Sequence, residues 1–318
     1  MTDKKALVFP GQGSQKVGMG QALAQHFPEA AQVFDEVDEV LGYKLSAICF
    51  DGPEDRLRQT HHAQPALMAV SMAVVRVLEA RGIDLSSFSF MAGHSLGEFT
   101  ALCASGVLTL AQTARLLDIR GRAMQEASEV TREDESGGDA YKGVMAAVIG
   151  LEAALLDDLP VSHTAPVCVL ANDNAAGQVV LSGHQQGLDK AKDWVLAQGA
   201  RFVPLPVSGA FHSPLMDAAS ARLSEALESE TFLAPRVPII TNVSAAPQTD
   251  PATLKKHIKQ QVTGRVRWRE TMDVMRMHGI TYVVEAGAGR VLCGLFKRQH
   301  PDIQVAAAGD VASVEALF

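Results

Sequence analysis

The segment Phe88-Ser89-Phe90-Met91-Ala92-Gly93-His94-Ser95-Leu96-Gly97-Glu98 joins a short apolar run to a G-x-S-x-G pentapeptide and then to a helical pattern. The apolar run predicts a buried strand, and the residues from about Glu98 onward predict a helix. A sharp turn between the two must present Ser95, and the flanking glycines relieve the crowding in such a turn. The segment therefore predicts an α/β fold in which Ser95 is a nucleophile at the start of a helix.

The sequence on both sides of this segment repeats the alternation of strands and helices. Residues 5–9 predict a buried strand that runs into Gly11-Gln12-Gly13, and residues 17–27, 30–41 and 64–82 predict helices. After residue 213, helices are expected at about 214–227, 251–262 and 268–278, with strands at 239–242 and 282–285. This alternation predicts a mostly parallel sheet that is covered by helices on both faces.

A different pattern interrupts this alternation in the middle of the chain. Strands are expected at 143–149, 167–171, 178–182 and 201–206, and helices at 151–159 and 188–198. The order βαββαβ is that of a ferredoxin-like unit. We therefore expect an α/β-hydrolase-like large subdomain, formed by residues 1–138 and 208–318, with an inserted ferredoxin-like small subdomain at 139–207.

Composition excludes several classes of protein. Of the 318 residues 47% are hydrophobic and 20% are charged, as in ordinary globular proteins, and the formal charge of −8 argues against nucleic acid as a general partner. The longest apolar stretch, residues 66–75, is too short for a membrane span, and the first residues do not resemble a signal peptide. The four cysteines include no C-x-x-C pair, so no metal or redox site is predicted. We expect a monomeric cytoplasmic protein without a membrane partner.

A nucleophilic serine needs a base within hydrogen-bonding reach, and ten histidines compete for this role. His212 lies in the Gly- and Pro-containing loop 207–214, where the chain returns from the insert to the large subdomain. His94 directly precedes the serine, but successive side chains at a tight turn point apart. His212 is therefore the preferred candidate, and we expect His94 to be structural.

Four motifs occur in the order found in malonyl-CoA:acyl carrier protein transacylases, and the chain resembles this family over nearly its whole length. They also resemble the acyltransferase domains of polyketide and animal fatty acid synthases. The motifs are Phe9-Pro10-Gly11-Gln12-Gly13-Ser14-Gln15, Gly93-His94-Ser95-Leu96-Gly97-Glu98, Arg120-Gly121-Arg122-Ala123-Met124-Gln125 and Gly209-Ala210-Phe211-His212-Ser213-Pro214.

The resemblance implies a role for each matching catalytic position. Ser95 matches the nucleophile and His212 the base, while Gln12 and the backbone of Leu96 match the oxyanion hole. Gln261 matches a glutamine whose main-chain carbonyl orients the histidine, so that no triad aspartate is needed.

The resemblance also implies residues that bind the substrate. Arg120 matches the arginine that holds the free carboxylate of the malonyl group, a task that suits a planar guanidinium. Phe211 matches a residue that restricts the α-substituent. Asn174 and Gln64 match positions that line the cleft. From the local sequence alone, Arg120 would be an ordinary arginine on a helix surface.

The sequence departs from the family at three places. Phe99 stands where tyrosine is usual, Ala288 stands where proline is usual, and the connection at about 129–139 is longer than in the family. We expect none of these differences to touch the chemistry.

These assignments imply that a malonyl group passes from coenzyme A to Ser95 and then to the phosphopantetheine thiol of acyl carrier protein, for fatty acid or polyketide synthesis. No metal or redox cofactor is implied, and coenzyme A enters only as a thioester substrate. Kinetics of the ping-pong type are expected.

Two alternatives stay open. A serine hydrolase or thioesterase would need an acid between the serine and the histidine, and five aspartates are available by position: Asp157, Asp158, Asp173, Asp189 and Asp193. A non-catalytic scaffold or carrier-docking module is the other alternative.

The region 255–276 is more basic than the rest of the chain. It contains seven basic residues but only two acidic ones, Glu270 and Asp273. These cations either attract an acidic carrier protein or coenzyme A phosphates, or form a solvated helix face. They are Lys255, Lys256, Lys259, Arg265, Arg267, Arg269 and Arg276.

Overall fold

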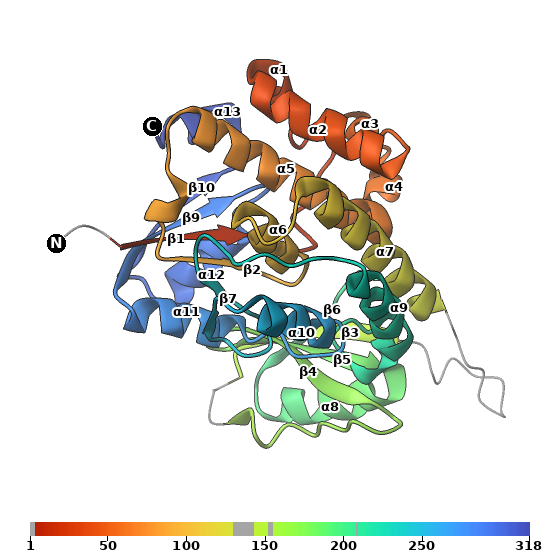
Figure 1. The fold of residues 1–318 in the computed structure, drawn as a ribbon. Coiled ribbons are helices and arrows are strands. Elements are labelled where there is room, and N and C mark those ends of the chain that lie inside the picture. The colour runs from red at the N-terminus through yellow and green to blue at the C-terminus, as the bar shows by residue number, and fades with distance from the viewer. Residues whose placement is uncertain (1–3, 130–142, 152–154, 208) are drawn as a thin grey trace.

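The computed structural model describes residues 4–129, 143–151, 155–207 and 209–318, and contains two sheets (Figure 1). The larger sheet has the order β10-β9-β1-β2-β7-β8, and its neighbouring strands are parallel except for the β7–β8 pair. Its strands are β1 (Lys4–Phe9), β2 (Phe90–Gly93), β7 (Ile239–Ile240), β8 (Pro247–Gln248), β9 (Ile280–Ala286) and β10 (Gln304–Ala308).

Helices cover both faces of this sheet, as the alternation of elements predicts. On β1, Leu7 and Phe9 point into a core shared with one set of helices, whereas Ala6 and Val8 point into a core on the opposite face. The first set includes α1 (Gln21–His26), α2 (Pro28–Leu41), α3 (Leu45–Asp51), α4 (Glu54–Arg58), α5 (Thr60–Ala80), α6 (Leu96–Ala104), α7 (Leu110–Glu129), α9 (Asp217–Glu228), α10 (Pro251–Gln261) and α13 (Val311–Glu315). The second set is α11 (Trp268–Met277) and α12 (Val291–Gln299).

The smaller sheet is antiparallel throughout and has the order β4-β5-β3-β6. Its strands are β3 (Gly143–Ile149), β4 (Cys168–Ala175), β5 (Gln178–His184) and β6 (Arg201–Pro204), and α8 (Gln185–Ala197) packs on it. The order is that of a ferredoxin-like unit, in which the first and third strands lie at the centre. Residues 152–154 lie outside the described part. The expected helix at 151–159 is wrong in residues 155–159, where one residue in 3₁₀ conformation is followed by bends and turns rather than an α-helix.

The first predicted helix also begins later than expected. Residues 17–20 form turns because Gly18 and Gly20 have φ values of 89° and 78°, in the left-handed region, and α1 begins only at Gln21. The expected subdomain boundaries near 138 and 208 fall on residues outside the described part, so the exact division stays a prediction.

Helix α5 is long and apolar enough to span a membrane by length and composition alone. Of its most apolar window, 83% is buried inside the protein, against α2 and α7 among others. Such burial is typical of a core helix.

Candidate active site

The nucleophile turn holds Ser95 in a conformation that few residues adopt. Ser95 has φ 53° and ψ −112°, between the end of β2 and the start of α6. A Cβ on Gly93 would lie 1.9 Å from the Gly97 carbonyl carbon, and a Cβ on Gly97 would lie 2.4 Å from the Phe9 carbonyl oxygen. Both glycines are therefore required by close backbone approach, and the strained serine is the kind of backbone outlier found at active sites.

His212 lies within hydrogen-bonding distance of Ser95. Its Nε2 is 2.8 Å from Ser95 Oγ, while its Nδ1 is 2.9 Å from the Gln261 carbonyl oxygen and 3.2 Å from that of Gly264. Because both carbonyls can only accept, Nδ1 carries the proton and Nε2 is free to accept from the serine. Burial, followed by the charge of Arg120, lowers the pKa of His212 to about 3, so the resting imidazole is neutral.

Arg120 lies in the interior beside the same hydroxyl. It is 1% exposed, and its guanidinium donates to Gln64 Oε1 at 2.7 Å, Gln261 Oε1 at 2.9 Å and Ser95 Oγ at 3.1 Å. Burial lowers its pKa to about 10, with Glu98 acting in the opposite direction, so the group is charged at neutral pH. It forms no ion pair with any carboxylate in the described residues.

The expectation that Phe99 lies away from the chemistry is wrong. Its ring centroid is 5.6 Å from Arg120 Cζ, so the ring faces the guanidinium from the second turn of α6. Ala288, the other departure, is buried at 3% exposure in the turn before α12. The long connection at 129–139 lies almost wholly outside the described residues.

The other predicted site residues have different contacts. Leu96 is the first residue of α6, so its N–H has no acceptor within the helix. Gln12 follows β1, and its side-chain amide is 3.5 Å from Thr60 Oγ1. Asn174 accepts at 2.8 Å from His94 Nε2, which leaves His94 in a structural role. Phe211 is 6% exposed and packs into the main core beside the base.

Two residues that had no predicted role complete the site. Asn242, just after β7, accepts from Ser95 N at 2.8 Å and donates to the Gly93 carbonyl at 2.7 Å, so it holds the nucleophile turn from both sides. Glu98 accepts from Asn242 N at 3.1 Å and from Gln261 Nε2 at 2.7 Å. The sequence signals were weak: Glu98 is the only charge in the apolar helix α6, and Asn242 follows a strand neighbouring β2.

The acid of a conventional hydrolase triad is absent from the described surroundings of His212. Of the five candidate aspartates, Asp173 is fully buried but contacts Arg265 and Arg269, at 2.5 and 2.8 Å. Within the described ranges, no three His, Cys, Asp or Glu side chains are grouped to hold a metal.

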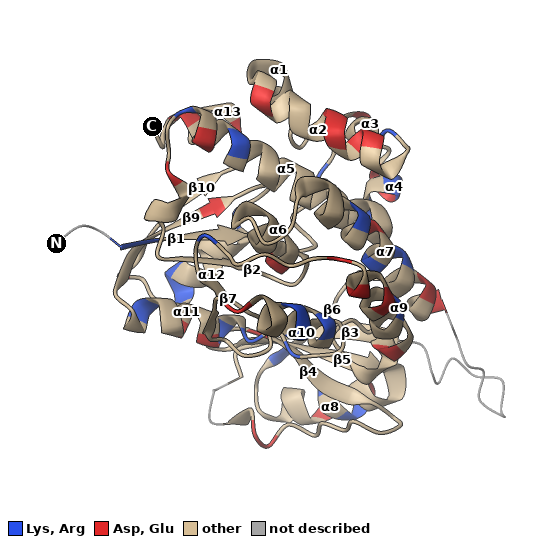
Figure 2. Ribbon diagram, viewed as in Figure 1, with Lys and Arg blue, Asp and Glu red and all other residues tan. Residues whose placement is uncertain are grey.

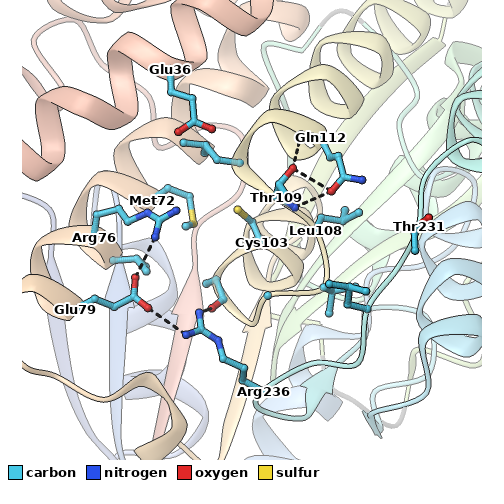
Figure 3. A pocket seen from close by; sticks show the side chains of 16 residues that line it. Glu36, Met72, Arg76, Glu79, Cys103, Leu108, Thr109, Gln112, Thr231 and Arg236 are labelled. Carbon is cyan, nitrogen blue, oxygen red and sulfur yellow. Dashed lines mark hydrogen bonds and ion pairs between the residues drawn. The ribbon is translucent and has the colours of Figure 1, made fainter.

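A cavity of about 460 Å³ opens at the other end of α6, and Figure 3 shows its lining. Three of its four charged side chains contact one another, since Arg76 and Arg236 both contact Glu79, at 3.6 and 3.3 Å. No predicted site residue lines it. The candidate site is therefore defined by the contacts around Ser95 and not by this cavity.

Comparison with known proteins decides the family. A family model described as the acyl transferase domain matches residues 6–300. The chain belongs to the acyl transferase family. The resemblance inferred from the four motifs is thereby confirmed.

Relatives of this acyl transferase share nearly its full length. The malonyl CoA-acyl carrier protein transacylase of Bacillus subtilis is 38% identical over 98% of this chain and 95% of its own. That of Salmonella typhimurium is 37% identical over 98% of each chain.

Solved structures agree with the predicted fold class. The acyl-carrier-protein-S-malonyltransferase from Bartonella henselae has a TM-score of 0.92 at 45% identity, over 99% of this chain and 98% of that one. A malonyl-transacylase in complex with a type II PKS acyl-carrier protein has a TM-score of 0.90 at 38% identity, over 98% of each chain. The α/β architecture with a second, smaller sheet is confirmed.

The basic region 255–276 is largely neutralised in three dimensions. Six of its seven cations contact carboxylates or main-chain carbonyls, so the surplus along the sequence is not a free basic face. Figure 2 shows these basic residues on and around α10 and α11, with acidic residues beside them. Lys256 is the one for which the described residues show no such contact.

Proposed function

We propose that the protein transfers a malonyl group from coenzyme A to the phosphopantetheine thiol of acyl carrier protein through an ester on Ser95. The observation that carries the proposal is the buried Arg120 guanidinium, 3.1 Å from Ser95 Oγ and without a carboxylate partner in the described residues. A buried cation beside the nucleophile suits an acyl group that brings its own negative charge.

The first half-reaction forms the acyl-enzyme. Ser95 Oγ attacks the thioester carbonyl carbon while His212 Nε2 takes its proton, and the carbonyl electrons move to an oxyanion near the N-terminus of α6. The Leu96 N–H and Gln12 stabilise this oxyanion. When the oxyanion collapses, the C–S bond breaks, and His212 returns the proton to the coenzyme A sulfur.

The second half-reaction runs through the same groups in reverse. His212 takes the proton of the carrier thiol, the thiolate attacks the Ser95 ester, and the serine oxygen leaves and recovers the proton. Arg120 holds the malonyl carboxylate during both steps, with Gln64 and Gln261 fixing the guanidinium. We propose that no metal or redox cofactor takes part and that the enzyme acts as a cytoplasmic monomer.

The competing function, hydrolysis of acyl thioesters, uses the same nucleophile. The contacts of His212 Nδ1 with two main-chain carbonyls favour the transferase, since a hydrolase of the usual kind would place a carboxylate there.

Incubating the protein with malonyl-CoA that carries a label in the malonyl group, with and without holo carrier protein, distinguishes transfer from hydrolysis. We expect label on the protein in the absence of carrier, and label on holo carrier protein when it is added. Rapid release of free malonate without carrier would instead support the hydrolase, and no labelling at all would contradict both.

A further inference from the structure

Glu98 occupies an unusual position for an acid. It lies in the first turn of α6, is 1% exposed, and forms no ion pair with any residue that the structure describes. Burial raises the pKa of its carboxyl to about 7, although the nearby charge of Arg120 and hydrogen bonds from Gln261 and Asn242 lower it. Because an unpaired buried carboxyl is costly, packing of α6 alone does not explain a glutamate here.

The hydrogen bonds of Glu98 determine how the Gln261 side chain is turned. Gln261 Nε2 donates to Glu98 Oε2 at 2.7 Å and to the Ser95 carbonyl at 2.9 Å. The Ser95 carbonyl can only accept, and Glu98 Oε2 already accepts from Asn242 N, so the amide nitrogen faces both. The amide oxygen therefore faces the other way, toward Arg120 Nη2 at 2.9 Å.

The reverse orientation of this amide would be unfavourable for Arg120. It would place the NH₂ group of Gln261 against a guanidinium, which has only donors, and would remove one of the three acceptors that hold it. The orientation of the carboxylate-binding arginine thus depends in part on an acid that does not touch it.

We propose that Glu98 is a positioning residue, which holds the Gln261 amide with its oxygen toward Arg120 and so keeps the guanidinium aligned for the substrate carboxylate. This inference rests on the proposed malonyl transfer. It predicts that Glu98 affects substrates with a free carboxylate and has little effect on those without one, because Gln261 holds His212 through its main chain and not its side chain.

Glu98→Gln tests the proposal with little change in volume. A glutamine can present either oxygen or nitrogen to Gln261, so the bridging amide loses its charged acceptor and is oriented only by the Ser95 carbonyl and Arg120. We expect the ratio of kcat/KM for malonyl-CoA to that for acetyl-CoA to fall about 10- to 100-fold, the range for a hydrogen bond to a charged group. Gln261→Met, which keeps the main-chain carbonyl, should lower the same ratio and serves if Glu98→Gln folds poorly.

A double-mutant cycle with Arg120→Ala separates positioning from general disruption. If Glu98 acts through Arg120, Glu98→Gln should not change the malonyl to acetyl ratio in the Arg120→Ala background. The matched control is Glu285→Gln, another fully buried glutamate, which accepts from Leu292 N and Cys293 N at the start of α12. It should lower the thermal midpoint without changing the ratio.

The outcomes are distinct. Equal losses for malonyl- and acetyl-CoA in Glu98→Gln, or a further fall of the ratio in the Arg120→Ala background, would overturn the positioning role. If the wild type itself transfers no malonyl group to carrier protein, the proposed function fails, whatever Glu98 does.

Discussion

Replacing Arg120 with alanine tests the proposed function most directly. In the wild type the guanidinium is buried and held by three neutral acceptors, so it is already aligned before the substrate arrives. The malonyl carboxylate would supply the missing negative charge. Acetyl-CoA has no such group and would leave the cation unpaired.

The size of the effect follows from this difference. Truncating one partner of a buried, hydrogen-bonded charge pair costs about 2–5 kcal/mol. Since about 1.36 kcal/mol corresponds to a factor of ten, kcat/KM for malonyl-CoA should fall by about 30-fold to several thousand-fold. Acetyl-CoA loses only the effect of the contact with Ser95 Oγ, which both substrates share. The malonyl to acetyl ratio should therefore approach unity.

Steady-state transfer to holo carrier protein, measured with both thioesters, gives the ratio. Arg122→Ala is a matched control, because Arg122 lies two residues further along α7, is 42% exposed and pairs with Asp118 at 2.8 Å. It should leave the ratio unchanged. An unchanged ratio in Arg120→Ala, or equal losses for the two thioesters, would refute the assignment of Arg120 as the carboxylate-binding group.

Three further predictions concern the nucleophile, the base and the neighbour of the base. Ser95→Ala should abolish the malonyl adduct seen by mass spectrometry after exposure to malonyl-CoA; an adduct on the mutant would place the nucleophile elsewhere. The pKa of His212 is about 3 in the folded protein, against 6.5 for an ordinary histidine. Between these two pH values the imidazole takes up a proton only in the unfolded chain. The stability that the neutral imidazole contributes is therefore present above pH 6.5 and is lost as the pH falls toward 3. From pH 7 to pH 5 the unfolding free energy of the wild type should therefore fall by about 2 kcal/mol relative to that of His212→Gln. Urea titrations at the two pH values measure this change, and a constant difference between the two proteins would contradict the neutral, buried imidazole. Phe211→Ala should raise kcat/KM for methylmalonyl-CoA relative to malonyl-CoA, because the buried ring beside the base would no longer restrict the α-substituent; an unchanged ratio would remove Phe211 from the specificity site.

The sequence predicts best where a local rule applies. The turn at Ser95 follows from a strand, two glycines and a helix, and the antiparallel sheet follows from the spacing of its strands. The first predicted helix starts four residues too early, because apolar spacing continues through Gly18 and Gly20, whose left-handed conformations end the regularity. The short helices α3 and α4 have too few residues to show a helical period, so the sequence does not predict them.

The contacts around Arg120 could not be found in this way. By helical pattern Arg120 belongs on a surface, and only the resemblance to the family marks it; its partners Gln64 and Gln261 are 56 and 141 residues away. Such distant pairings leave no local period. The basic region at 255–276 also depends on distant residues, because several of its cations pair with acids far away in the sequence, such as Asp173 and Asp302.

In the part of the chain that the structure describes, His212 Nδ1 contacts two main-chain carbonyls and no carboxylate, which is consistent with the charge of the proposed substrate. An aspartate there would add a second negative charge near Arg120, which would compete with the malonyl carboxylate for the guanidinium. Main-chain carbonyls orient the imidazole without this competition, although they stabilise the imidazolium less. A thioester tolerates the weaker support because its leaving group is a thiol, whose pKa of about 8.5 is far below that of the amine leaving group of a peptide. The arrangement of His212 and that of Arg120 therefore suit the same substrate, because among the described residues no carboxylate contacts either the imidazole or the guanidinium directly.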